Sequence, residues 1–199
     1  AEVGLEPVGR APDDPPASTS RGALRWGAVY RSPAVWHLGL VYVAFGFSYI
    51  IYMTFFVKTL MAEGGYTQAS AGGLFMTMGW VSLLCGVIWG TVSDVIGRKN
   101  ALIIVYLIQA VSYSLFALWP EPAGFTISAI LFGLTAWSIP AIMAATCGDM
   151  LGARLAPAAL GFITLLFGIG QALGPAVAGA MAQASGSHLP AVLLAAAIA

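Results

Sequence analysis

The chain alternates between long apolar blocks and short polar breaks. Six apolar blocks are present, near residues 35–58, 69–93, 101–119, 123–147, 158–182 and 189–199. A helix of about 20 apolar residues crosses a hydrocarbon core about 30 Å thick, so each of the first five blocks predicts a transmembrane helix. The sixth block is too short to span, and it predicts a helix that is incomplete within this sequence.

The breaks between the blocks have the composition of turns. Gly64 and Gly65 follow Glu63 after the first block, and Pro120 and Pro122 end the third. Proline does not continue a helix, because it lacks the backbone N–H and its ring clashes with the preceding turn. The pattern therefore predicts an all-α, polytopic bundle of transmembrane helices.

Residues 1–33 have a different character. Pro7, Pro12, Pro15 and Pro16 lie among acidic and hydroxyl side chains, and such a composition buries too little apolar surface to form a core. We expect a flexible tail or a linker here, followed by a transmembrane domain over residues 34–199. No secretory signal peptide is visible, since the chain does not start with a basic tip followed by an apolar core.

Composition agrees with a membrane protein. Hydrophobic residues make up 59% of the chain and charged residues 8%, whereas soluble domains carry about a quarter charged residues. The 24 glycines and 11 prolines suit a membrane, where small residues let helices pack closely. Lys plus Arg equal Asp plus Glu at eight each, so the chain lacks the basic excess of a nucleic-acid-binding protein.

The basic residues fall on one side if the blocks alternate in direction. That side holds Arg10, Arg21, Arg25, Arg31, Arg98, Lys99 and Arg154, and the other side holds Lys58. Cytoplasmic segments of membrane proteins carry the excess of Lys and Arg. We therefore expect the N-terminal tail and the turns at 94–100 and 149–157 to be cytoplasmic, in a bacterial inner membrane.

The sequence shows no pattern typical of a catalytic or metal site. Cys85 and Cys147 are the two cysteines, and neither has histidines or carboxylates nearby in the sequence that would form a metal-binding cluster. HExxH and GxSxG motifs are absent, so an intramembrane enzyme is disfavoured. We expect no cofactor and no metal.

The turn after the second block carries a specific motif. Gly90, Asp94, Gly97, Arg98 and Lys99 match the pattern G-x-x-x-D-x-x-G-R-[RK], which resembles the loop between the second and third helices of a major facilitator superfamily half. The resemblance implies a gating loop that latches the two halves together. From the residues alone, Gly90 permits close helix approach and Gly97 supplies a turn. Asp94 can cap a helix N-terminus or pair with Arg98. The alternative is an ordinary basic cytoplasmic turn.

A second resemblance lies in the fifth block. Gly161, Gly170, Gly174, Pro175 and Gly179 nearly reproduce the pattern G-x8-G-x3-G-P-x2-G-G of the fifth helix in many proton-coupled antiporters. Ala178 departs from the pattern, although alanine is also small. The resemblance implies a bend and a packing seam, and the alternative is a glycine-rich packing face with a proline kink.

The two resemblances imply one six-helix half of a twelve-helix transporter. The fourth block lacks an Arg that first halves of such antiporters usually carry, and the tail is similar to a central linker. We therefore favour the C-terminal half over the N-terminal half. The implied partners are the lipid bilayer, a small-molecule solute and the other six-helix half of the same chain, with no nucleic acid.

Aromatic residues indicate a possible substrate path. Five rings recur at spacings of three and four in the first block and share one helical face: Tyr42, Phe45, Tyr49, Tyr52 and Phe56. We take Tyr49 and Tyr52, with Trp80, Trp137 and Gln171 from three other blocks, as candidates for lining this path. Helix packing or contact with lipid is the alternative for the rings. Asp149 and Arg154 are candidates to join the gating loop in a cytoplasmic network.

The middle of each block lacks Asp, Glu, Lys and Arg. Ionisable groups within membranes usually mark ion or proton pathways, so a titrating carboxylate is expected in the other half. We expect secondary active transport of a small organic solute by alternating access, as an antiporter or a symporter. A non-transporting membrane scaffold or sensor is the alternative.

Overall fold

The computed structural model describes residues 26–199, apart from the side chains of Trp26 and Ala28. Its helices are α1 (Trp26–Tyr30), α2 (Pro33–Ala62), α3 (Gln68–Ser82), α4 (Cys85–Ile96), α5 (Arg98–Leu118), α6 (Pro122–Thr135), α7 (Ser138–Ser185) and α8 (Leu189–Ile198). The described residues contain no strand. The prediction of an all-α helical bundle is therefore confirmed.

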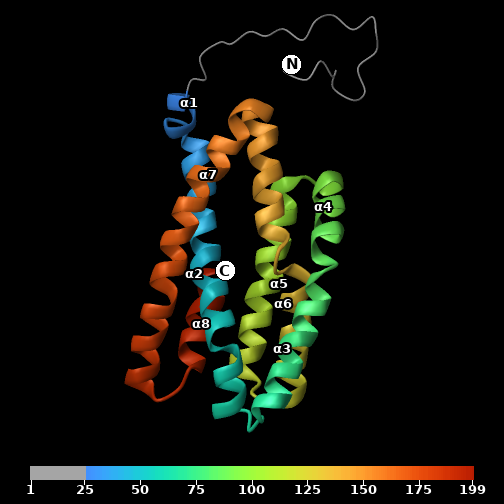
Figure 1. Cartoon of the computed structure of the whole chain (residues 1–199), viewed down its shortest axis with the longest axis vertical. Helices are drawn as coiled ribbons and strands as arrows, with labels where there is room; N and C mark the ends of the chain where they lie inside the picture. The colour runs from blue at the N-terminus through green and yellow to red at the C-terminus, as the bar shows by residue number, and fades with distance from the viewer. Residues whose placement is uncertain (1–25) are drawn as a thin grey trace, which may run out of the picture.

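Helix α7 consists of two arms that run in opposite directions. Gly152 has φ +73° and ψ 166°, which is outside the helical region. Figure 1 shows the chain rising through the first arm, residues 138–151, and descending through the second arm, residues 153–185. Glycine suits this reversal because a positive φ is strained for other residues.

Length and composition mark three helical stretches as able to cross a membrane. They are Pro33–Ala62, Arg98–Leu118 and the 64-residue stretch Pro122–Ser185, and α3 with α4 makes a fourth if this bent pair is one span. One membrane crossing needs about 20 residues, and the longest stretch reverses at Gly152. It therefore has the length for two crossings.

The turns gather at two opposite ends of the bundle (Figure 1). One end holds α1, the turn between α4 and α5, and the reversal in α7. The other end holds the turns that follow α2, α5 and α7. The first end therefore carries Arg31, between α1 and α2, Arg98 and Lys99, at the start of α5, and Arg154, just after the reversal at Gly152. Lys58 is in the last part of α2, toward the second end. Arg10, Arg21 and Arg25 lie outside the described residues.

Local sequence explains several helix starts. Pro33 and Pro122 are in the first turns of α2 and α6, where the missing backbone N–H has no partner to lose. At α3 the Thr67 side chain accepts a hydrogen bond from the Ser70 N–H at 3.2 Å. This cap satisfies one of the free amides of the first turn.

The core divides into two apolar clusters. The cluster near the second end includes Tyr52, Phe56, Phe116 and Phe132, from α2, α5 and α6. The other cluster includes Val35, Val105, Ile142 and Ile163, from α2, α5 and both arms of α7. Helix α2 contributes to both clusters and passes along the whole bundle, so it positions the residues of the candidate site.

Candidate functional site

Arg98 gathers two carboxylates at the first end of the bundle. Its Nη1 pairs with Asp94 Oδ1, and its Nε donates to Asp149 Oδ2 at 2.9 Å. Nη1 also donates to Ser93 Oγ at 2.6 Å. Gly97, with φ +88°, forms the sharp turn between α4 and α5 that places Arg98 here. Asp149 of α7 therefore forms an ion pair with Arg98 of α5, at the turn for which a gating loop was predicted.

Two further charged residues were predicted to belong to the gating loop and the cytoplasmic network. Lys99 follows Arg98 and is exposed. Arg154 comes two residues after Gly152; it is exposed and interacts with another group. A methyl group added at Gly90 would meet no described atom within 4 Å. Close approach of a described helix does not explain Gly90, contrary to the expectation from sequence.

An uncharged polar pair lies farther along the bundle. Gln171 Nε2, from the second arm of α7, donates to Tyr49 Oη of α2 at 3.0 Å. The Tyr49 ring lies 5.9 Å from the Phe167 ring and 6.4 Å from that of Trp137, centroid to centroid. Tyr49 and Gln171 are half-buried and Trp137 is exposed. We call Tyr49, Trp137 and Gln171 the tyrosine–glutamine site.

The other two candidates for a substrate path are placed elsewhere. Tyr52 is fully buried, and its hydroxyl lies 2.7 Å from Ser128 Oγ among the rings of the core. Trp80 on α3 is 66% exposed. Tyr52 therefore packs in the interior, which agrees with helix packing as the alternative role of the aromatic face. The structure shows no contact between Trp80 and the tyrosine–glutamine site.

Two of the predicted glycines form a packing seam. A methyl group at Gly170 would meet the backbone of Val43 and Phe47, and one at Gly174 would lie 2.6 Å from the side chain of Ile50. The seam brings the second arm of α7 against α2. Gly161 and Gly179 have open space around them, and Pro175 lies within the helical arm.

A groove of about 600 Å³ lies between α2, α5 and the end of α8. Its lining is mostly apolar, with His37, Arg98 and Lys99 among the polar residues and Ile198 and Ala199 at the end of α8. The groove extends from the last turn of α8 to the Arg98 cluster. It therefore lies beyond the C-terminal end of α8.

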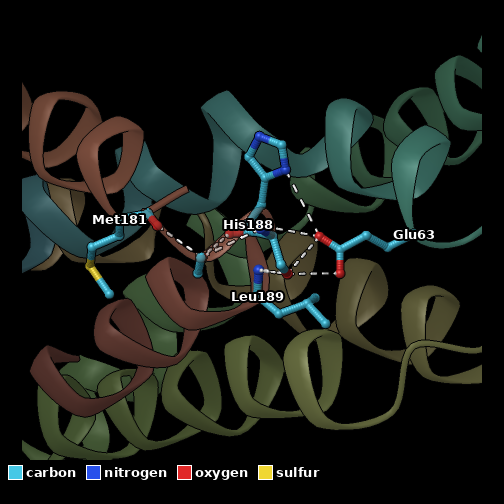
Figure 2. Close-up of polar contacts among 6 residues, drawn as sticks. Glu63, Met181, His188 and Leu189 are labelled. Carbon is cyan, nitrogen blue, oxygen red and sulfur yellow. Dashed lines mark hydrogen bonds and ion pairs between the residues drawn. The ribbon is translucent and has the colours of Figure 1, made fainter. Parts of the chain in front are cut away.

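A third polar cluster lies at the second end and was not anticipated from sequence. Glu63 Oε1 accepts from the His188 backbone N–H and from Ser187 Oγ, each at 2.9 Å, and Oε2 accepts from Ser187 Oγ at 3.0 Å. His188 Nδ1 lies 3.9 Å from the same carboxylate. Figure 2 shows the Glu63 side chain pointing into the turn that precedes α8. A carboxylate at this position is stabilised by the partial positive charge of a helix N-terminus.

The described residues hold no group of three His, Cys, Asp or Glu side chains that could bind a metal ion. Cys85 and Cys147 are free thiols, both buried. The groups within each polar cluster described above are therefore suited to charge pairing or hydrogen bonding.

Comparison with known proteins gives the family. A family model described as "Uncharacterised MFS-type transporter YbfB" matches residues 14–199. The human protein "Solute carrier family 67 member A1" is 29% identical over 184 residues, which cover 90% of this chain and 43% of that protein. The chain thus spans less than half of the length of this relative. Because the family model covers nearly the whole sequence, the chain belongs to the YbfB-like family of MFS-type transporters.

Proposed function

We propose that the chain forms one six-helix half of a secondary transporter that moves a small organic solute by alternating access. The observation that carries this proposal is the tyrosine–glutamine site. Its phenol and amide join α2 to the second arm of α7 without a charged group, beside the exposed ring of Trp137. Polar side chains within a membrane bundle are costly and tend to mark a solute pathway.

The solute chemistry follows from the groups that are present. Tyr49 and Gln171 offer a phenolic oxygen and an amide, both able to donate and accept hydrogen bonds. The neighbouring rings of Phe167 and Trp137 offer flat apolar surface. These groups suit an amphipathic organic molecule with a polar tip, and the tyrosine–glutamine site provides no charged partner for an ionic solute.

The Arg98 cluster serves as the gating loop in this proposal. Asp94 and Asp149 are 64% and 60% exposed in their side chains, and Arg98 is 25% exposed. Exposed ion pairs contribute about 0–1 kcal/mol each, so these pairs can be exchanged for others at little cost. When the two halves rock, Arg98 or Asp149 can therefore leave its partner in this cluster and pair with a group on the opposing half.

We also propose the placement of the chain in a membrane. The end with Arg31, Arg98, Lys99 and Arg154 faces the cytoplasm, since cytoplasmic segments are enriched in basic residues. The membrane is a bacterial inner membrane. The tail at residues 1–33 is the linker that joins a preceding six-helix half, so the chain is the C-terminal half.

The groove beyond α8 fits a helix rather than a solute in this arrangement. Helix α8 has 10 residues, which span about 15 Å, half of a hydrocarbon core. The groove begins at Ile198 and Ala199 and extends toward Arg98. We propose that a continuation of α8 fills it. The proposed function therefore does not use this groove as the transport site.

Uptake by the whole protein tests the transport proposal. Compounds with an aromatic ring and an alcohol or amide group are screened for thermal stabilisation of the purified protein, and those that bind are tested for uptake into proteoliposomes. Gln171→Leu removes the amide while keeping a similar volume, and it is expected to lower uptake at least tenfold. Gln183→Leu, at an exposed position of the same helical arm, is the matched control and should keep uptake near the wild-type rate.

The scaffold or sensor alternative predicts a different result. A sensor binds its ligand without moving it, so stabilisation would occur with no uptake into the vesicles. An equal loss of uptake in Gln171→Leu and Gln183→Leu would contradict the assignment of the site. The proposal assigns no catalytic step to the chain.

A further inference from the structure

Two neighbouring helical columns are interrupted inside the bundle. The first column consists of α3 and α4, which are bent by 41° at a break between Ser82 and Cys85. The second consists of α6 and the first arm of α7, with a break between Thr135 and Ser138. Side chains from one column bond to the break in the other, so the two breaks lie at the same depth.

The breaks have different local causes. In the second column Pro140 follows Ala136 by four residues, so it removes the N–H that would bond to the Ala136 carbonyl and crowds that carbonyl. The first column has no proline. Its backbone tightens instead, because the N–H groups of Leu83 and Leu84 bond to carbonyls three residues back, each at 3.3 Å. Short tight turns within a helix often mark a hinge.

The break in the second column is supported by groups from neighbouring helices. Trp89 Nε1 of α4 donates to the Leu134 carbonyl at 2.8 Å, and the Trp137 N–H donates to Cys85 Sγ at 3.4 Å. Gln109 Nε2 of α5 lies 3.4 Å from the Thr135 carbonyl. Free backbone groups in hydrocarbon must find partners inside the protein. These bonds satisfy backbone groups at the second break, and the bonds of Trp89 and Cys85 also tie α4, just past the first break, to it.

The segments on each side of the breaks pack in pairs. Helix α3 packs chiefly on α6, while α4 packs on α5 and α7, and α3 and α4 share little contact. Gly133 of α6 is so close to α3 that a methyl group there would lie 2.8 Å from the Met78 carbonyl. Thus α3 and α6 pack closely as one unit, with α5 also against α6, and α4 packs with α5 and α7 on the other side of the breaks.

We propose that the aligned breaks form a joint, across which the α3–α6 unit tilts relative to α4 and the first arm of α7. The proposal rests on the transport function proposed above and adds a place within this half where it flexes. The Trp89 and Cys85 bonds hold the joint in the bend observed here. A cavity of about 190 Å³ lies beside the joint, lined by residues that include Ser82, Ala136 and Trp137. It provides volume into which the moving segments can shift.

Distances between paired spin labels test the joint in the whole protein in lipid nanodiscs. Met76 of α3 and Val95 of α4 are both exposed and lie on opposite sides of the joint. Met76 and Ile127 of α6 are exposed within one unit. The native Cys85 and Cys147 are buried, so labels attach to cysteines introduced at these exposed positions.

The two spin-label pairs are expected to give different distance distributions. The Met76–Val95 pair gives two distance populations, and Trp89→Phe, which keeps an aromatic ring but loses the indole N–H, changes their ratio at least twofold. The Met76–Ile127 pair gives one narrow distance in both proteins. Trp119→Phe is the matched control, because its indole bonds to Glu121 in an exposed turn, and it should leave both pairs unchanged.

Two outcomes would overturn the joint. One is a single Met76–Val95 distance in the wild-type protein, which decides the question even where Trp89→Phe does not fold. The other is a Met76–Ile127 distance as broad as the Met76–Val95 distance, because the α3–α6 unit would then not move as one body. The labels report distances without any solute, so failure of the joint leaves the transport proposal to the uptake assay.

Discussion

At the scale of single residues, Arg98 stands out because one guanidinium faces two carboxylates from different parts of the chain. Asp94 is four residues before it on the preceding helix, and Asp149 is 51 residues after it. A planar guanidinium has five N–H donors and can serve several acceptors at once. These three side chains together carry one more negative than positive charge, which favours approach of a basic group.

A double-mutant cycle on Arg98→Gln and Asp149→Asn measures this contact. Both carboxylates are more than half exposed, so the coupling energy in thermal unfolding is expected to be about 0.5 kcal/mol, within the range for solvated ion pairs. Asp94→Asn in place of Asp149→Asn provides the comparison within one turn. A coupling above about 2 kcal/mol would contradict the description of an easily exchanged surface pair.

The two tyrosines of α2 are expected to differ when each loses its hydroxyl. Tyr52→Phe removes a bond to Ser128 in a fully buried position and should lower the free energy of unfolding by about 0.6–1 kcal/mol. Tyr49→Phe leaves Gln171 in a half-buried site and should mainly lower uptake of the solute. Thermal unfolding and uptake, measured on both variants, separate the roles. Equal effects on both measurements would argue against the distinction.

Partners close along the chain could be anticipated from the sequence. Asp94 and Arg98 are four residues apart on either side of the Gly97 turn, and pairing with Arg98 was one of the two roles expected for Asp94. The cluster of Glu63 with Ser187 and His188 was missed, because 124 residues separate Glu63 from Ser187 and no local pattern joins them. The residues that follow Glu63, namely Gly64 and Gly65, signalled only a turn.

At the scale of elements, the contact between α2 and α7 is the most extensive in the bundle. Small residues from both helices make it possible, since Gly39 and Gly46 of α2 face Leu166 and Phe167 of α7. Close backbone approach increases van der Waals contact between helices in a membrane, where lipid removes the hydrophobic driving force. This seam fixes the distance between Tyr49 and Gln171.

Alanine substitutions at two glycines in the second arm of α7 have opposite expected effects. Gly170→Ala places a methyl group against the backbone of α2, and overpacking of this kind costs about 1–3 kcal/mol. Gly161→Ala meets open space in the same helical arm and should be neutral or stabilising by up to about 1 kcal/mol, because alanine favours helix. Thermal unfolding in detergent compares the two. A Gly170→Ala protein as stable as Gly161→Ala would rule out the tight seam.

The helix columns were easier to anticipate than their interruptions. The block near 123–147 was expected as one helix, although Pro140 offered a signal for the break between α6 and α7. The block near 69–93 gave no such signal, since Leu83 and Leu84 favour helix formation. That break is stabilised by Cys85 and Trp89, through bonds to a segment about 50 residues away. Only the tertiary structure reveals such support.

At the scale of the whole molecule, the two ends of the bundle differ in charge, and this sets the expected orientation. Single cysteines at Asn100, beside Arg98, and at Glu121, in the turn after α5, are exposed at opposite ends. In intact bacterial cells a membrane-impermeant thiol reagent should label the cysteine at 121 and not the one at 100. Disrupted cells, in which both should react, provide the control. Labelling of position 100 alone would reverse the proposed orientation.

The Glu63 cluster links the end of α2 to the start of α8, two elements that lie far apart in the order of synthesis. At about 5–20 residues per second, the 124 residues between Glu63 and Ser187 take about 6–25 s to appear. For that interval the carboxylate has none of the partners that it holds in the finished fold. Docking of α8 is therefore a late event in assembly. Until α8 docks, the surface of the earlier helices that it covers in the finished fold faces the lipid or the insertion machinery.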